Sequence, residues 1–127
     1  MKITLYNLMR ALPVFQKIVE VPFPAKQAFF LSRLTKKLDV EMENFNECRK
    51  NLLLKYAVKD ENGKPIIEND SVRLEQDPAL QAAFQQESAD LLNAEITLDV
   101  EPIPLDWLEN ATLTPQEMAT IETFIKV

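Results

Sequence analysis

The feature that most constrains this fold is an uninterrupted stretch, residues 25–56, that holds neither proline nor glycine. The segment just before it, Val21-Pro22-Phe23-Pro24, stops any preceding helix, because a residue that precedes proline avoids the α region. Pro24 in turn suits the first position of a new helix. The stretch therefore predicts one long helix, roughly 50 Å from end to end at about 1.5 Å per residue.

Apolar residues mark one side of this predicted helix, because they recur every three or four positions, with Glu41 as an interruption. They are Leu31, Leu34, Leu38, Phe45, Cys48 and Leu52. The other residues of so small a chain cannot cover a helix of that length alone. We therefore expect the leucine and phenylalanine residues of this strip to lie near the interface of a homo-oligomer, most simply a dimer. Cys48 is expected to be a small buried hydrophobe, and Phe29 and Phe30 are expected to lie in the core.

Shorter helices are predicted before and after the long one. Thr4 can cap a first helix that runs to about residue 19, and Pro13 should kink or split it. Asp77 caps another helix with Pro78 in its first turn. Thr114-Pro115-Gln116-Glu117 is a capping box, which predicts a carboxy-terminal helix docked on the core through its apolar residues.

Turns and strands are predicted between these helices. Gly63 can supply the positive φ of a turn, and residues 66–74 read as a weak hairpin whose own turn includes Asn69 and Asp70. Residues 96–100 alternate apolar and polar side chains, as in a half-buried strand. Together these elements predict an α+β fold that is mostly helical, with one long central helix and a small antiparallel sheet.

Composition narrows the class of protein. A length of 127 residues is ordinary for one domain, so residues 1–127 are predicted to form a single domain. No run approaches the roughly 18 apolar residues that a membrane span requires. The single cysteine suits a reducing compartment. The predicted location is therefore the cytoplasm.

Two scarce residue types bear on catalysis. The chain has no histidine and one glycine. A Ser-His-Asp or Cys-His arrangement is thus impossible, and one glycine cannot build a Rossmann or P-loop phosphate site. Chemistry based on carboxylates alone or on tyrosine is the remaining enzymatic alternative. We predict a binding or assembly protein with no cofactor and no metal site, and not an enzyme.

Charge is unevenly distributed along the chain. Residues 1–59 hold 11 Lys and Arg against 5 Asp and Glu, whereas residues 60–127 hold 3 against 15. Pairing between the two halves within the domain is the favoured interpretation, and an external polyanion is the alternative. The net charge of −6 argues against general nucleic-acid binding, because phosphate contacts need a basic face.

Four residues are candidates for binding. Arg33, Lys36 and Lys37 form the densest basic cluster, which could hold a small phosphate-bearing ligand or could simply be a solvated helix face. Trp107 is the only tryptophan. It is a candidate interface anchor, because tryptophan is enriched at interface hot spots, although a place in the core is the alternative.

The order of several segments resembles small uncharacterised accessory proteins of tailed bacteriophages and prophages. The segments are Asn51-Leu52-Leu53-Leu54-Lys55-Tyr56, Asp60-Glu61-Asn62-Gly63-Lys64-Pro65, Leu91-Leu92-Asn93-Ala94-Glu95-Ile96, Glu101-Pro102-Ile103-Pro104-Leu105 and Leu113-Thr114-Pro115. The resemblance implies a phage origin, and hence the host cytoplasm, but it assigns no catalytic or binding residue.

Two functions follow from that resemblance together with the missing catalytic parts. The first is a non-enzymatic binding protein that inhibits a host defence protein or sequesters a small nucleotide. The second is a virion morphogenesis factor, either an assembly chaperone or a connector component. The expected partners are further copies of the chain, a host or phage protein, and a small anionic nucleotide.

Overall fold

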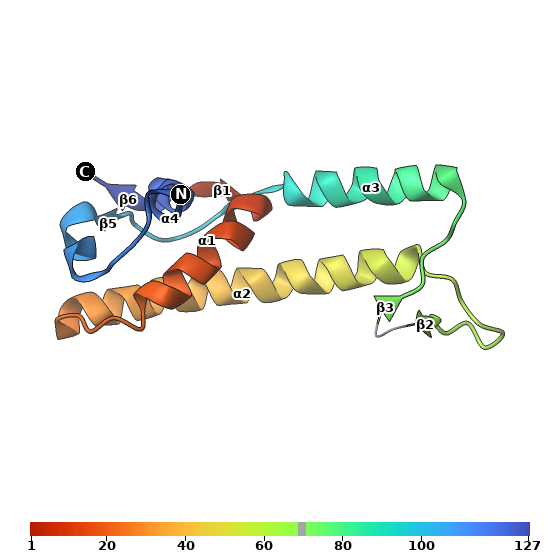
Figure 1. The fold of residues 1–127 in the computed structure, drawn as a ribbon, viewed down its shortest axis with the longest axis horizontal. Helices are drawn as coiled ribbons and strands as arrows, with labels where there is room; N and C mark the ends of the chain where they lie inside the picture. The colour runs from red at the N-terminus through yellow and green to blue at the C-terminus, as the bar shows by residue number, and fades with distance from the viewer. Residues whose placement is uncertain (69–70) are drawn as a thin grey trace. The chain divides into compact units, whose positions relative to one another are not determined.

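A computed structural model describes residues 1–68 and 71–127 of the chain. The long predicted helix is present as α2, Ala25–Lys55, and has 31 residues (Figure 1). It begins where predicted, since the Pro24 carbonyl oxygen accepts the Ala28 amide at 2.9 Å. The predicted fold class is confirmed: the chain is mostly helical, with one long helix and small sheets.

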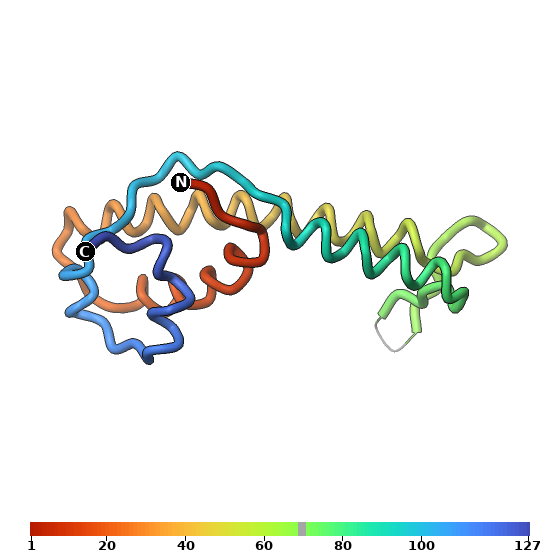
Figure 2. The backbone as a smooth tube through the Cα atoms, turned by 90° about the horizontal axis from the view of Figure 1, so that it is seen from above, coloured from red at the N-terminus to blue at the C-terminus, as the bar shows by residue number. Residues whose placement is uncertain are grey.

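The described residues divide into two compact units, and α2 contributes to both. Unit 1 contains Met1–Met42 and Ala94–Val127, and unit 2 contains Glu43–Asn93. Both ends of the chain therefore belong to unit 1, where Figures 1 and 2 draw them. The prediction of a single domain over residues 1–127 stays a prediction.

Unit 1 combines helices with two pairs of short strands. Besides the first part of α2, its elements are β1 (Lys2–Thr4), α1 (Leu5–Ile18), β4 (Glu95–Thr97), β5 (Ile103–Pro104), η1 (Leu105–Asn110), α4 (Pro115–Thr120), η2 (Glu122–Phe124) and β6 (Ile125–Lys126). β1 pairs antiparallel with β4, with Ile3 opposite Ile96. β5 pairs in parallel with β6, with Pro104 opposite Lys126. Each strand pair thus ties one end of the chain to the segment that follows residue 94.

Helix α1 is held by its cap and by its buried face. The Thr4 Oγ1 accepts the Asn7 amide at 3.1 Å, which confirms the predicted cap. The helix continues through Pro13, so the predicted split does not occur. Pro13 removes one backbone hydrogen bond, but Leu8 and Phe15 on the same helix are fully buried, and their burial offsets that cost.

The carboxy-terminal segment contributes directly to the core of unit 1. The predicted capping box is confirmed: the Thr114 Oγ1 accepts the Glu117 amide at 3.1 Å, and the Glu117 Oε1 accepts the Thr114 amide at 3.0 Å. After α4, Ile121 and Phe124 are both buried. The Phe124 ring meets the Phe15 ring edge to face, with centroids 5.1 Å apart. This segment is therefore docked, as its sequence predicts.

The apolar strip of α2 corrects the argument for an oligomer interface. Leu31, Leu34, Leu38 and Phe45 are buried within a single chain, and Leu52 is half-buried. The rest of the chain covers these side chains, so the strip does not need a partner, and the area argument is wrong. The homo-oligomer itself stays a prediction.

Three other residues of α2 lie outside the core, contrary to prediction. Cys48 is exposed, and Phe29 and Phe30 are 59% and 45% exposed. The reason is the angle around the helix: at about 100° per residue, Phe29 lies on the side opposite Leu38. The buried face of α2 is narrow, and these side chains fall beside it or behind it.

Unit 2 holds the end of α2 together with β2 (Ile67–Glu68), β3 (Ser71–Val72) and α3 (Pro78–Leu92). β2 and β3 pair antiparallel, as predicted, although Asn69 and Asp70 of the predicted turn lie outside the described residues. Gly63 has a φ of +75°, which confirms its predicted role. The Asp77 Oδ1 caps α3 by accepting the Ala79 amide at 2.8 Å. None of the residues of α3 is buried.

Within the part of the chain that the structure describes, no helix is both long enough and apolar enough to cross a membrane.

Candidate functional site

A cavity of about 460 Å³ in unit 1 brings together basic and aromatic side chains. Its lining includes Phe30, Arg33, Lys37, Trp107 and Lys126. The other lining residues are Leu34, Asp99, Val100, Glu101, Pro102, Ile103 and Pro104. We call it the Trp107 cavity.

Three segments place these side chains. On α2, Phe30, Arg33 and Lys37 are three and four residues apart, so they share one side of the helix. Trp107 lies on η1, which begins directly after Pro104 of β5. The register of β5 and β6 sets Lys126 opposite Pro104, and this pairing delivers the third cation.

The aromatic side of the cavity offers surface for a planar group. The rings of Phe30 and Trp107 have centroids 6.3 Å apart, with planes inclined by 34°. Trp107 is half-buried. Its indole N–H donates no hydrogen bond to any residue in 1–68 or 71–127, so that donor is available to a ligand.

The cations of the cavity keep their charge free of carboxylate partners in the described residues, although the Arg33 guanidinium lies over the Phe29 ring, 5.8 Å from its centroid. No carboxylate of the described residues lies within 4 Å of the Arg33, Lys37 or Lys126 nitrogens. The Lys37 ammonium donates a hydrogen bond to the backbone carbonyl of Asp99, which fixes its position without neutralising its charge. Charge-assisted hydrogen bonds to an anion are therefore possible here.

Two acidic residues, Asp99 and Glu101, belong to the lining of the same cavity. Ionised carboxylates only accept hydrogen bonds. A ligand that fills the cavity should therefore carry hydroxyl or amino donors in addition to its anionic group. This mixture of cations, carboxylates and aromatic faces suits a compact ligand with several kinds of group.

The structure divides the basic cluster predicted from the sequence. Arg33 and Lys37 line the Trp107 cavity, whereas Lys36 lines a separate depression of about 270 Å³ with Val21 and Phe23. Trp107, predicted as a candidate interface anchor, lines the same cavity as Arg33 and Lys37.

Sequence reasoning missed Phe30 and Lys126 as site residues. Phe30 is predicted to lie in the core, as large apolar side chains usually do. Lys126 carries one signal that could have identified it: it is the only basic residue after Arg73, in a strongly acidic part of the chain.

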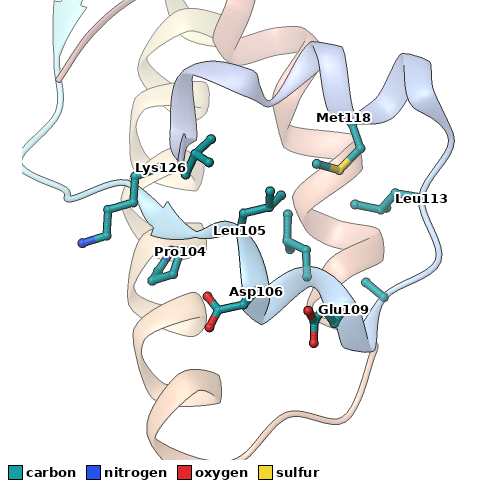
Figure 3. A pocket seen from close by; sticks show the side chains of 10 residues that line it. Pro104, Leu105, Asp106, Glu109, Leu113, Met118 and Lys126 are labelled. Carbon is teal, nitrogen blue, oxygen red and sulfur yellow. The ribbon is translucent and has the colours of Figure 1, made fainter.

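A second cavity, of about 690 Å³, adjoins the first, since Pro104 and Lys126 line both. Leu105, Leu113 and Met118 point toward one another across it (Figure 3). Its lining also includes Asp106, Leu108, Glu109, Ala111 and Val127. We call it the Met118 cavity. Its walls are mainly apolar, with two carboxylates.

Metal-binding groups do not gather in the described residues: no three His, Cys, Asp or Glu side chains there could hold one ion. The Trp107 cavity instead presents hydrogen-bond donors, acceptors and aromatic faces. Such groups bind and orient a ligand.

Comparison of the chain with models of protein families, with curated protein sequences and with solved structures gave no match. The resemblance to phage accessory proteins thus stays a prediction. Function is inferred from the geometry of unit 1.

Proposed function

We propose that the chain is a non-enzymatic binding protein that sequesters a small nucleotide in the Trp107 cavity. The observation that carries the proposal is the meeting of Arg33, Lys37 and Lys126 with the rings of Phe30 and Trp107. Cations recognise a phosphate, and aromatic faces recognise a base. Nucleotides are the common class of small ligand that has both a phosphate and an aromatic base.

The remaining groups of the cavity suit the sugar. Hydroxyl groups of a ribose donate hydrogen bonds, and Asp99 and Glu101 supply carboxylate acceptors. The volume of the Trp107 cavity, about 460 Å³, is also large enough for a nucleotide, because small-ligand cavities fall in the range of about 300–1,000 Å³. Each part of a nucleotide therefore has a chemical counterpart in the lining.

A long nucleic acid fits the same lining poorly. The two carboxylates would face phosphates along a continuous backbone, and the chain as a whole carries a net charge of −6. A single nucleotide avoids this repulsion by placing its phosphate at the cations and its sugar at the carboxylates.

The biological role in this proposal is removal of a signalling nucleotide from a host defence system. It draws on the resemblance to phage accessory proteins and on the missing histidine. Direct inhibition of a host protein and a role in virion morphogenesis remain the alternatives predicted from the sequence, and neither is tied to the Trp107 cavity.

Titration calorimetry against mononucleotides, cyclic mononucleotides and cyclic dinucleotides tests the proposal, with inorganic phosphate as the probe for anion binding alone. Arg33→Glu/Lys37→Glu should weaken nucleotide binding about a hundredfold or more, since charge-assisted contacts contribute about 1.5–3 kcal/mol each. Trp107→Leu should weaken nucleotide binding but leave phosphate binding nearly unchanged.

Arg49→Glu/Lys50→Glu is the matched control. It makes the same change of charge at two exposed positions of α2 that do not line the cavity. It should bind as the wild type does. The proposal fails if no nucleotide binds the wild type at about 1 mM, or if both double variants bind equally well.

A further inference from the structure

One face of α2 in unit 1 is exposed and carries both cations and apolar side chains. Lys26, Phe29, Arg33, Lys36 and Val40 are all exposed, and at about 100° per residue they fall within an arc of about 80°. Phe29 and Val40 are 59% and 57% exposed. We call these five residues the α2 stripe. It lies outside the buried strip of the same helix.

The Met118 cavity has acidic residues in its lining where the α2 stripe has basic ones. Like the stripe, it also presents apolar side chains. Leu105, Leu113 and Met118 face one another in it, and Asp106 and Glu109 belong to its lining with their carboxylates pointing away from Met118 (Figure 3). No cation of the described residues lies within 4 Å of these two carboxylates. Lys126 also lines the cavity, but its ammonium points away from Met118 in Figure 3.

Among the residues that the structure describes, most charges of unit 1 have no ion-pair partner. Residues 1–42 hold 7 Lys and Arg against 3 Asp and Glu, and residues 94–127 hold 1 against 7. Among the described residues, one ion pair joins these two segments: Lys17 Nζ lies 2.9 Å from Glu117 Oε1. The pairing within the domain that the sequence favours is thus largely unrealised in unit 1. A basic surface and an acidic surface remain open together.

We propose that the α2 stripe of one copy docks on the Met118 cavity of a second copy. Phe29 would enter among Leu105, Leu113 and Met118, and the cations of the stripe would lie beside Asp106 and Glu109. This homo-oligomer uses side chains that are exposed, in contrast to the buried strip of Leu31, Leu34, Leu38 and Phe45.

Electrostatics selects this pairing over the two alternatives between identical copies. Two stripes facing each other would bring six cations together, and two Met118 cavities would bring four carboxylates together. Only stripe against cavity joins opposite charges and buries apolar surface from both sides. Complementary charge of this kind sets the orientation of partners and speeds their encounter.

Sedimentation equilibrium at tens of micromolar measures the association. The wild type should self-associate, and the association should weaken as salt rises, because screening shortens the Debye length to about 10 Å or less. Phe29→Glu and Leu105→Glu should each weaken it about thirtyfold or more, as loss of a central interface anchor does. Both positions are exposed, at 59% and 42%, so neither change disturbs the core.

An equimolar mixture of the two variants gives the sharpest test. The Phe29→Glu chain keeps an intact cavity, and the Leu105→Glu chain keeps an intact stripe. The mixture should therefore associate more strongly than either variant alone. Ile67→Glu and Leu80→Glu are the controls, since they place the same charge at exposed apolar positions of unit 2, and they should associate as the wild type does.

Three outcomes would overturn the proposal. A wild type that stays monomeric at low salt would leave both surfaces to partners of other sequence. Association that Phe29→Glu and Leu105→Glu leave intact would place the interface elsewhere. Loss of association in only one of the two variants would mean that like surfaces, and not stripe and cavity, meet. Phe29 contacts both Phe30 and Arg33, whereas Leu105 does not line the Trp107 cavity, so Leu105→Glu is the variant that tests docking separately from nucleotide binding.

Discussion

The edge-to-face contact between Phe15 and Phe124 gives a prediction for the stability of unit 1. Both rings are almost completely buried, at 0% and 1% exposure, and their centroids lie 5.1 Å apart. Phe124→Ala removes a ring from a closed core, which costs about 3–5 kcal/mol in free energy of unfolding. At about 4 °C per kcal/mol for a chain of 127 residues, the melting temperature should fall by about 12–20 °C.

A milder change separates bulk from ring geometry. Phe124→Leu keeps most of the buried volume but loses the edge-to-face pair, which is worth about 0.5–1.5 kcal/mol. A double-mutant cycle with Phe15→Leu should return a coupling energy in that range. Phe29→Ala is the control, because that ring is 59% exposed and its loss should change stability by no more than about 0.5 kcal/mol.

Circular dichroism melts at low micromolar concentration measure all of these variants. If Phe124→Ala lowers the melting temperature by less than about 4 °C, its ring contributes under about 1 kcal/mol. The carboxy-terminal segment would then be loosely attached in solution, and the reasoning from burial would be refuted.

Three further predictions concern local structure. Thr114→Ala should lower the free energy of unfolding by about 1 kcal/mol in urea titrations, because it removes the cap of α4, whereas Thr112→Ala should change it little. The Thr114 amide and the Lys17 ammonium lower the pKa of Glu117, so ionised Glu117 stabilises the folded state at any pH above the ordinary carboxyl pKa. This stabilisation should be lost as the pH falls through the pKa of Glu117 in the folded state. The difference in melting temperature between wild type and Glu117→Gln should therefore disappear at acid pH. Gly63→Ala should cost about 1–2 kcal/mol in the same urea titrations, because the φ of +75° strains any residue with a Cβ, although no neighbouring atom lies in the way.

Helix ends could be predicted from the sequence because a cap is a local contact. Thr4, Asp77 and Thr114 each accept a hydrogen bond from an amide two or three residues further along. All of the atoms in such a contact are close in sequence, so no knowledge of the rest of the fold is required.

Burial on the long helix could be predicted only in part. The three-and-four spacing found Leu31, Leu38 and Phe45, which are indeed covered, but it gave no measure of how wide the covered face is. Cys48 and Phe30 sit at about the same angle around the helix, beside that face, and both are exposed. What covers α2 comes from distant segments, and helical spacing contains no information on them.

The same limit applies to the Trp107 cavity. Arg33 and Lys37 could be proposed because they are near each other on one helix. Trp107 and Lys126 join them through the pairing of β5 with β6, whose strands have two residues each. Strands so short have no detectable alternation, and one of them contains Pro104, which normally ends a strand. The sequence therefore had no signal for this assembly.

The split of unit 1 into two distant segments determines when it can fold during synthesis. Leu8 and Phe15 are synthesised more than a hundred residues before Ile121 and Phe124, which share their core. Unit 2 is continuous from Glu43 to Asn93 and has no such delay. Helix α1 must therefore wait with its apolar face uncovered until residues 121–124 have been synthesised. During that interval a chaperone has its best opportunity to bind, and a ribosome stalled before codon 121 would release a chain unable to complete the core of unit 1.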